Sequence, residues 1–265
     1  MASAVSNIHA GSNGNERFND EALSWDARPF VHEASQAASD AISSRLQNVE
    51  LPKGGAQVLE IGCGTGILSF LMAKDPKVAR IVAVDAAQGM IDVLKTKLDK
   101  DESAKSKILP LALMLEDPED AALPADDHGH GRQKFDIITS HLVLHHIPDL
   151  RSVLQTMHGC LAPGGCLMLT DFEDFGPEAK RFHPAGKMAG VARHGINAKD
   201  MAVMLQEIGL EDVDVTAAWT MKKTVEKFDG EFAAGNEEFG NAGATKVEKG
   251  EIMEFPFLLC YGLKK

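Results

Sequence analysis

The chain has 265 residues, of which 44% are hydrophobic and 25% are charged, as in ordinary globular proteins. At about 150 residues per domain, this length predicts one large domain or two small ones. Lys and Arg total 27 against 39 Asp and Glu, and the resulting net charge of −12 argues against a nucleic-acid-binding protein. No apolar stretch approaches the roughly 18 residues that span a bilayer, so the sequence predicts no membrane span.

The amino-terminal region and the cysteines bear on cellular location. Residues 1–16 are rich in Ser, Asn, Gly and Ala and lack an apolar segment, so we expect a disordered tail rather than a secretory signal. The four cysteines form no CxxC pair, which indicates neither a disulfide framework nor a cysteine zinc site. Reduced thiols and a cytoplasmic location follow as expectations.

Residues 17–54 are predicted to form a helical cap before the first strand. Phe18, Ala22 and Trp25 fall on one helical face, and Pro29 follows a break in the pattern. Apolar residues then recur at helical spacing over 30–49, and a Pro-Lys-Gly-Gly turn ends that segment.

From residue 55 to the end, strands and helices alternate. Strands are expected at 57–61, 80–84, 107–115, 135–140, 165–170, 213–218 and 255–263. Helices are expected at 67–74, 90–100, 150–160 and 198–208. This alternation predicts a doubly wound α/β fold with a seven-stranded, mostly parallel sheet, which the last two strands close as an antiparallel hairpin. The connection at about 173–197 is expected to act as a lid over the ligand.

A glycine-rich loop, Glu60-Ile61-Gly62-Cys63-Gly64-Thr65-Gly66, follows the first strand and opens a helix. Glycines allow a tight turn and close approach of a ligand to the main chain. Asp85 ends the next strand, where a carboxylate can accept hydrogen bonds from two ribose hydroxyls. A dinucleotide site needs G-x-G-x-x-G, but Ile67 occupies the third glycine position, so the spacing favours a nucleoside that carries an amino acid.

With these residues, the chain resembles the class I S-adenosylmethionine-dependent methyltransferases, small-molecule type, of the kind found near ubiquinone and menaquinone methyltransferases. The resemblance runs from about residue 55 to 172 and includes the segments 60–66, 84–90, 135–138, 144–149 and 161–165. It implies that residues 55–265 form a Rossmann-like methyltransferase domain, with S-adenosyl-L-methionine as cofactor and a small molecule as methyl acceptor.

The resemblance also implies roles for individual residues. Gly62, Gly64 and Gly66 would line the methionine moiety and Asp85 would hold the ribose, while Met90 and the main chain at Met114 or Leu115 would lie near the adenine. The predicted cofactor site further includes Glu60, Cys63, Ala86 and Ser140. Ala87 replaces a serine that is frequent in the family, and an acid after the third strand is late or absent.

Three histidines are predicted as candidate bases that would take a proton from the acceptor. His141 and His145 follow the fourth strand, where parallel sheets place their ligands. His194 lies in the expected lid and is the preferred candidate. Asp171, at the same sheet edge, could polarise a histidine. His146 is expected to pack as a neutral capping residue, because Leu144 precedes the histidine pair and Ile147 follows it.

No metal site is predicted. His128 and His130 lie close together in a charged loop, but a metal site needs three or four converging ligands. The sequence therefore predicts a methyltransferase that acts on a small molecule and indicates no protein partner. Two alternatives remain open: a methyltransferase-like regulatory or assembly subunit without activity, and a nicotinamide-dependent oxidoreductase.

Overall fold

The computed structural model describes residues 12–126, 129–232 and 249–265. Its strands are β1 Ala56–Ile61, β2 Val78–Asp85, β3 Ile108–Ala112, β4 Phe135–His141, β5 Leu161–Phe172, β6 Glu211–Val225 and β7 Glu251–Leu263. Its α-helices are α1 Ser12–Trp25, α2 Pro29–Arg45, α3 Ile67–Met72, α4 Gln88–Leu98, α5 Glu102–Lys107, α6 Leu150–Cys160 and α7 Ala198–Glu207. Short 3₁₀ helices lie at Leu46–Asn48 (η1), Leu144–His146 (η2), Pro177–Phe182 (η3) and Ala185–Lys187 (η4).

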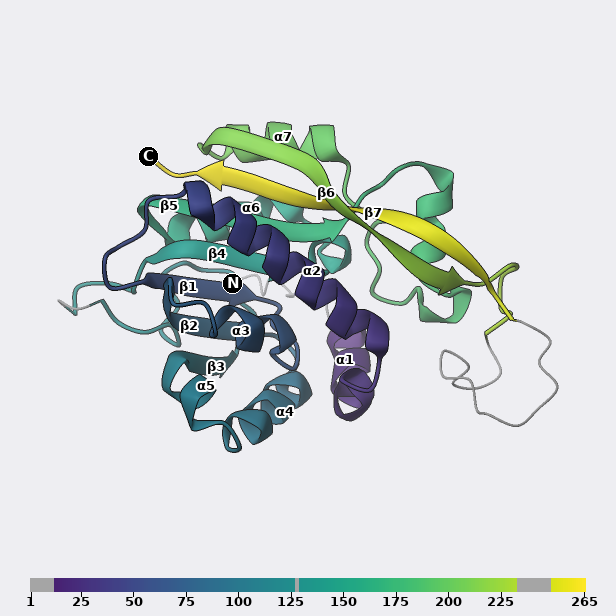
Figure 1. The fold of residues 1–265 in the computed structure, drawn as a ribbon, viewed down its shortest axis with the longest axis horizontal. Helices are drawn as coiled ribbons and strands as arrows, with labels where there is room; N and C mark the ends of the chain where they lie inside the picture. The colour runs from purple at the N-terminus through teal and green to yellow at the C-terminus, as the bar shows by residue number, and fades with distance from the viewer. Residues whose placement is uncertain (1–11, 127–128, 233–248) are drawn as a thin grey trace, which may run out of the picture.

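The strands form one seven-stranded sheet in the order β3-β2-β1-β4-β5-β7-β6 (Figure 1). The five strands β1 to β5 are parallel, whereas β7 runs antiparallel to both β5 and β6. The predicted doubly wound fold with its closing hairpin is confirmed. Strand order reverses between β1 and β4, and at such a point an open α/β sheet binds its ligand.

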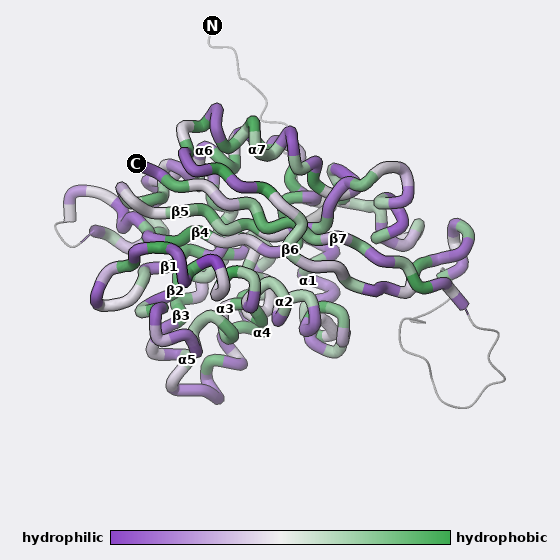
Figure 2. The backbone as a smooth tube through the Cα atoms, turned by 45° about the horizontal axis from the view of Figure 1, so that its top comes forward, coloured by the Kyte–Doolittle hydropathy of each residue, from purple (hydrophilic) through white to green (hydrophobic). Residues whose placement is uncertain are grey.

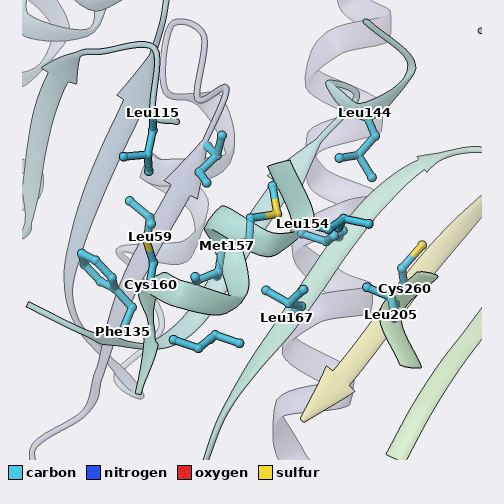
Figure 3. Packing of buried hydrophobic residues seen from close by; sticks show 14 of the residues in the cluster. Leu59, Leu115, Phe135, Leu144, Leu154, Met157, Cys160, Leu167, Leu205 and Cys260 are labelled. Atoms are coloured by element: carbon cyan, nitrogen blue, oxygen red, sulfur yellow. The ribbon is translucent and has the colours of Figure 1, made fainter. Parts of the chain in front are cut away.

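Helices cover both faces of the sheet because successive strand residues point to opposite sides. Val58 and Ile137 pack with residues of α2, α3 and α4, while Leu59 and Ile138 pack with residues of α6 and α7. Figure 3 shows this second face, where Leu154 and Met157 of α6 lie over Leu59 and Leu167. In Figure 2 the central strands accordingly contain green, hydrophobic stretches, interrupted by hydrophilic positions.

The two amino-terminal helices pack against different parts of the domain. Helix α2 crosses the sheet and packs against α3, and α1 packs along α4 (Figure 1). Helix α1 begins at Ser12, so the expectation of a disordered tail through Glu16 is wrong for residues 12–16. Residues 1–11 lie outside the described residues. None of the described helices combines the length and the apolar character needed to cross a membrane.

Other differences from the expected elements have local causes. The strands β6 and β7 extend beyond the predicted 213–218 and 255–263, since they continue to pair with each other past the edge of β5. The helix α5 was not expected, because its sequence has no apolar face. The side chain of Asp101 caps it by accepting a hydrogen bond from the amide of Ala104 at 3.0 Å.

Candidate active site

The glycine loop after β1 uses its three glycines for different purposes. All three adopt positive φ angles, which favour glycine. A Cβ atom on Gly62 would lie 2.3 Å from Val143, and one on Gly66 would lie 2.5 Å from Leu94, so these two glycines permit close packing. A Cβ on Gly64 would meet no heavy atom within 4 Å. Only Gly64 of the three therefore presents an open face to a ligand.

Asp85 at the end of β2 holds this loop. One carboxylate oxygen accepts a hydrogen bond from the amide of Gly64 at 2.7 Å, and the other accepts from the amide of Ala87 at 2.8 Å. Burial raises the pKa of Asp85, and both backbone hydrogen bonds oppose that rise. Each carboxylate oxygen can accept a further hydrogen bond, so Asp85 can fix the loop and also bind hydroxyl groups of a ligand.

Glu60 is a second carboxyl group beside the loop, and it is almost completely buried. Burial raises its pKa to about 8, although the hydroxyl of Ser69 donates a hydrogen bond to it. No salt bridge reaches Glu60 within the described part of the chain. A buried carboxyl group without a cationic partner at the wall of a cavity is suited to a positively charged ligand group.

These residues line one cavity of about 920 Å³, a volume near the upper end of the range for ligand sites. Of the residues predicted from the sequence, the cavity wall contains Glu60, Gly62, Cys63, Gly64, Asp85, Ala86, Met90, Met114, Leu115, His141 and His145. It does not contain Gly66, Ser140 or His194. Ser140 is buried, and His194 is exposed.

His145 lines the cavity from η2, just after β4, and is held by Asp171 of β5. The carboxylate of Asp171 lies 2.8 Å from Nδ1 of His145 and also accepts from the His145 amide at 3.1 Å. Because a carboxylate only accepts hydrogen bonds, Nδ1 carries a hydrogen, and in the neutral imidazole the lone pair is on Nε2. This Nε2 atom is buried and has no hydrogen-bond partner among the described residues.

Two more histidines approach His145. Nδ1 of His146 lies 2.8 Å from the carbonyl oxygen of Gly190, and the ring centroids of His145 and His183 are 5.0 Å apart. Burial lowers the pKa of His146 to about 4 and that of His183 to about 2. Burial likewise lowers the pKa of His141 to about 4. His146, His183 and His141 are therefore neutral at physiological pH.

Helix α1 and the turn after it form part of the cavity wall. Asn19 accepts a hydrogen bond from the amide of Gly89 at 2.7 Å. Asp26 accepts from the hydroxyl of Thr65, in the glycine loop, at 2.5 Å and from the ammonium of Lys97 at 2.7 Å. Arg17 donates to the carbonyls of Lys187 and Ala189. Helix α1 and the turn after it thus connect the glycine loop and α4 with the segment after η3.

The segment expected to be a lid contributes different residues from those predicted. His194 is exposed and outside the cavity wall, so we do not retain it as a base. Its neighbour Arg193 instead donates to the carbonyls of Leu144, Ile147 and Pro148, which fixes the turn that carries His145. Of the histidine pair at 128–130, His128 lies outside the described residues and His130 is exposed.

The sequence did not indicate that His183 would join His145 and His146. His183 lies 37 residues after His146, in an irregular segment where periodicity gives no information about position. Arg17, Arg28 and Phe182 also line the cavity and were not predicted as site residues. The sequence did indicate that Asp171 could contact a histidine, because β4 and β5 end at the same edge of the sheet.

Comparison with known proteins agrees with this geometry. A family model described as a methyltransferase domain matches residues 30–215. A malonyl-[acyl-carrier protein] O-methyltransferase from Priestia megaterium is 28% identical over 158 residues, covering 59% of this chain and 50% of that protein. A ubiquinone biosynthesis O-methyltransferase from Xanthomonas campestris is 32% identical over 149 residues, covering 55% of this chain and 54% of that protein.

Among solved structures, a candidate methyltransferase from Bacillus halodurans C-125 superimposes with a TM-score of 0.58 at 18% identity, covering 84% of this chain and 97% of that one. The chain belongs to the methyltransferase domain family, and its fold is that of the class I S-adenosylmethionine-dependent methyltransferases. The resemblance found in the sequence is thereby confirmed. The chain spans about half the length of the curated relatives it matches.

Proposed function

We propose that this protein transfers a methyl group from S-adenosylmethionine to a small-molecule acceptor. The observation that carries the proposal is one cavity lined both by Gly64, Asp85 and Glu60 and by His141 and His145. The part of the wall formed by Gly64, Asp85 and Glu60 (the cofactor end) suits the cofactor, and we assign the part around His145 (the acceptor end) to the acceptor. The sulfonium of S-adenosylmethionine supplies an electrophilic methyl group, which the acceptor displaces in line with the departing sulfur.

The residues of the cofactor end fit this molecule. The open face of Gly64 leaves room for the methionine moiety where a side chain would block it. Asp85 can accept from ribose hydroxyls, and buried Glu60 lies where a positively charged group would stabilise its ionised form. Residues of α1 and α2 line the cavity, so these two helices can exclude water from the reaction.

At the acceptor end, orientation of the nucleophile is the main contribution that we propose for the protein. Holding two reacting groups in line supplies much of the rate enhancement of such a transfer. The wall there combines Phe18, Trp25 and Phe182 with the buried histidines, which suits a partly apolar acceptor with one ionisable group. Malonyl-acyl carrier protein and ubiquinone biosynthesis appear in the names of relatives, and we take from them only that O-methylation is the reaction to test first.

A cytoplasmic location is part of this proposal. All four cysteines, Cys63, Cys160, Cys166 and Cys260, are free and buried, which supports a reducing environment.

The test is binding of S-adenosylhomocysteine, S-adenosylmethionine and NADH, measured by calorimetry on the wild type and on Asp85→Ala. We expect the two sulfur nucleosides to bind and NADH not to bind. Asp85→Ala should weaken S-adenosylhomocysteine binding about tenfold or more, because hydrogen bonds to a charged group, each worth about 1.5–3 kcal/mol, are lost.

Asp85 also holds the glycine loop, so the same titration uses an S-adenosylhomocysteine analogue that lacks both ribose hydroxyls. The substitution should weaken binding of this analogue much less, since the interaction that it removes is already missing. An equal loss for both ligands would assign Asp85 to the loop alone. Binding of NADH in preference to both sulfur nucleosides would overturn the proposed function. Activity is then tested with labelled S-adenosylmethionine and a metabolite extract, where the absence of any labelled product would favour a regulatory subunit.

A further inference from the structure

His145, His146 and His183 form a cluster of potential metal ligands on the wall of the acceptor end. One ring nitrogen from each lies within 4.8 Å of the other two. They come from two segments, since His145 and His146 belong to η2 and His183 follows η3. The strands β1 and β4 separate β2, which ends at Asp85, from β5, which contains Asp171, the partner of His145. We therefore assign these three rings no contact with the ribose that Asp85 would bind.

The hydrogen bonds of His145 and His146 involve Nδ1 and leave Nε2 as the nitrogen that could bind a metal ion. Nδ1 of His145 donates to Asp171, and Nδ1 of His146 donates to the carbonyl of Gly190, because neither of these oxygens can donate. In their neutral forms both residues therefore carry the lone pair on Nε2. In His145 this atom is buried and has no partner among the described residues. A histidine whose second nitrogen donates to a carboxylate is the usual arrangement around a protein-bound metal.

We propose that His145, His146 and His183 bind one divalent transition-metal ion of the zinc class, with an open coordination position toward the cavity. Three neutral imidazoles suit Zn²⁺, Co²⁺ or Fe²⁺, whereas Mg²⁺ and Ca²⁺ require oxygen ligands. Three protein ligands with a fourth position open is the pattern of catalytic rather than structural zinc sites.

The charges near the cluster indicate what occupies the fourth position. Imidazole ligands add no negative charge, and the carboxylate of Asp171, which contacts His145, supplies a single negative charge beside the proposed ion. An ion with two positive charges is therefore bound most favourably together with an anionic ligand. We assign this ligand to the acceptor as an oxyanion or thiolate, and this assignment rests on the proposed function.

In that arrangement the acceptor hydroxyl or thiol loses its proton to solvent when it coordinates the ion, because a bound cation lowers the pKa of its ligand. The resulting anion attacks the methyl carbon and the carbon–sulfur bond of the sulfonium breaks. The products are the methylated acceptor and neutral S-adenosylhomocysteine, and the metal keeps its oxidation state.

The experiment measures metal binding to tag-free, full-length protein after treatment with a chelator. Zn²⁺ is titrated by calorimetry, and Co²⁺ is titrated by its visible absorption, which reports the coordination geometry. We expect one ion per chain and no comparable binding of Mg²⁺. His183→Ala should abolish one-to-one binding and the Co²⁺ spectrum. Asp171→Asn should weaken Zn²⁺ binding about 10–100-fold, as expected for the partner of a metal-bound histidine.

His130→Ala is the matched control, because His130 is exposed and belongs to the loop with the other histidine pair. It should leave Zn²⁺ affinity and the Co²⁺ spectrum unchanged. If His183→Ala does not fold, as judged by its thermal transition, His146→Gln replaces it with the same expectation. Failure of the metal-free wild type to bind Zn²⁺ stoichiometrically at micromolar concentration would overturn the site, as would undiminished binding by His183→Ala.

Binding of S-adenosylhomocysteine to the metal-free protein separates this inference from the proposed function. If the nucleoside binds and Zn²⁺ does not, the metal site is wrong and the proposed function stands. If Zn²⁺ binds with the expected dependence on His183 and the nucleoside does not, the metal site stands and its assignment to a methyl acceptor is wrong.

Discussion

Gly64 offers a direct test of where the cofactor lies. Gly64→Val should abolish S-adenosylhomocysteine binding, because the side chain would fill space that is open in the cavity wall. Gly164 is the matched control: it also has a positive φ and open space where a Cβ would lie, but it does not line the cavity. Both variants carry a similar backbone strain. Thermal shifts with ligand should therefore vanish for Gly64→Val and persist for Gly164→Val, and equal shifts would place the ligand elsewhere.

Glu60 should make stability depend on pH. Its pKa rises from an ordinary 4.5 to about 8 on folding, chiefly through burial, so the folded protein holds this proton more tightly than the unfolded chain. The contribution of Glu60 to stability is thus fully present below pH 4.5 and is lost as the pH rises to about 8. Glu60→Gln removes this loss. The free energy of unfolding, measured with denaturant from pH 5 to 9, should rise for Glu60→Gln relative to the wild type as the pH increases to about 8. A constant difference between the two proteins over this range would contradict the raised pKa.

At the scale of elements, Asp26 connects the α1–α2 turn to the glycine loop through Thr65 and to α4 through Lys97. We expect S-adenosylhomocysteine to slow hydrogen exchange in residues 21–26, because binding at the loop stabilises the turn joined to it. In Asp26→Ala this slowing should be largely lost. Asp40→Ala, which removes an exposed acid of α2 that pairs with Gln36, should keep it. Equal protection in both variants would mean that the turn responds to ligand by another route.

The elements differ in how well the sequence predicted them, for physical reasons. Helix α6 matches its predicted bounds because Asp149 caps it and its apolar residues fall on one face. Helix α5 lacks that pattern, and in the outer part of β6 only Met221 and Val225 are buried, so periodicity gave too weak a signal to locate these segments. Most predicted cofactor residues line the cavity, because they belong to the glycine loop after β1 or to the end of another strand, and the sequence locates both. His183 and Arg17 come from segments whose position depends on tertiary packing.

At the scale of the whole molecule, a third hydrophobic cluster joins α2, η3 and the outer half of the β6–β7 hairpin. Phe182 is buried there and stacks on Phe172 with ring centroids 3.9 Å apart. Phe182→Ala should cost about 3–5 kcal/mol of unfolding free energy. Phe228 is 67% exposed, so Phe228→Ala should change stability by about 0.5 kcal/mol or less. Urea unfolding measures both, and similar small losses would show that the cluster is not a cooperative part of the fold.

Helix α1 contacts α4 through Asn19 and the segment at Lys187 and Ala189 through Arg17. This arrangement has a consequence for the sequence of events in turnover. We infer that the nucleoside enters while α1 is displaced and that the helix then completes the wall against which the second substrate binds. We expect a compulsory order of addition, with S-adenosylmethionine first and S-adenosylhomocysteine released last. Product inhibition by S-adenosylhomocysteine should then be competitive against S-adenosylmethionine and noncompetitive against the acceptor, whereas random addition would show that α1 admits either substrate without moving.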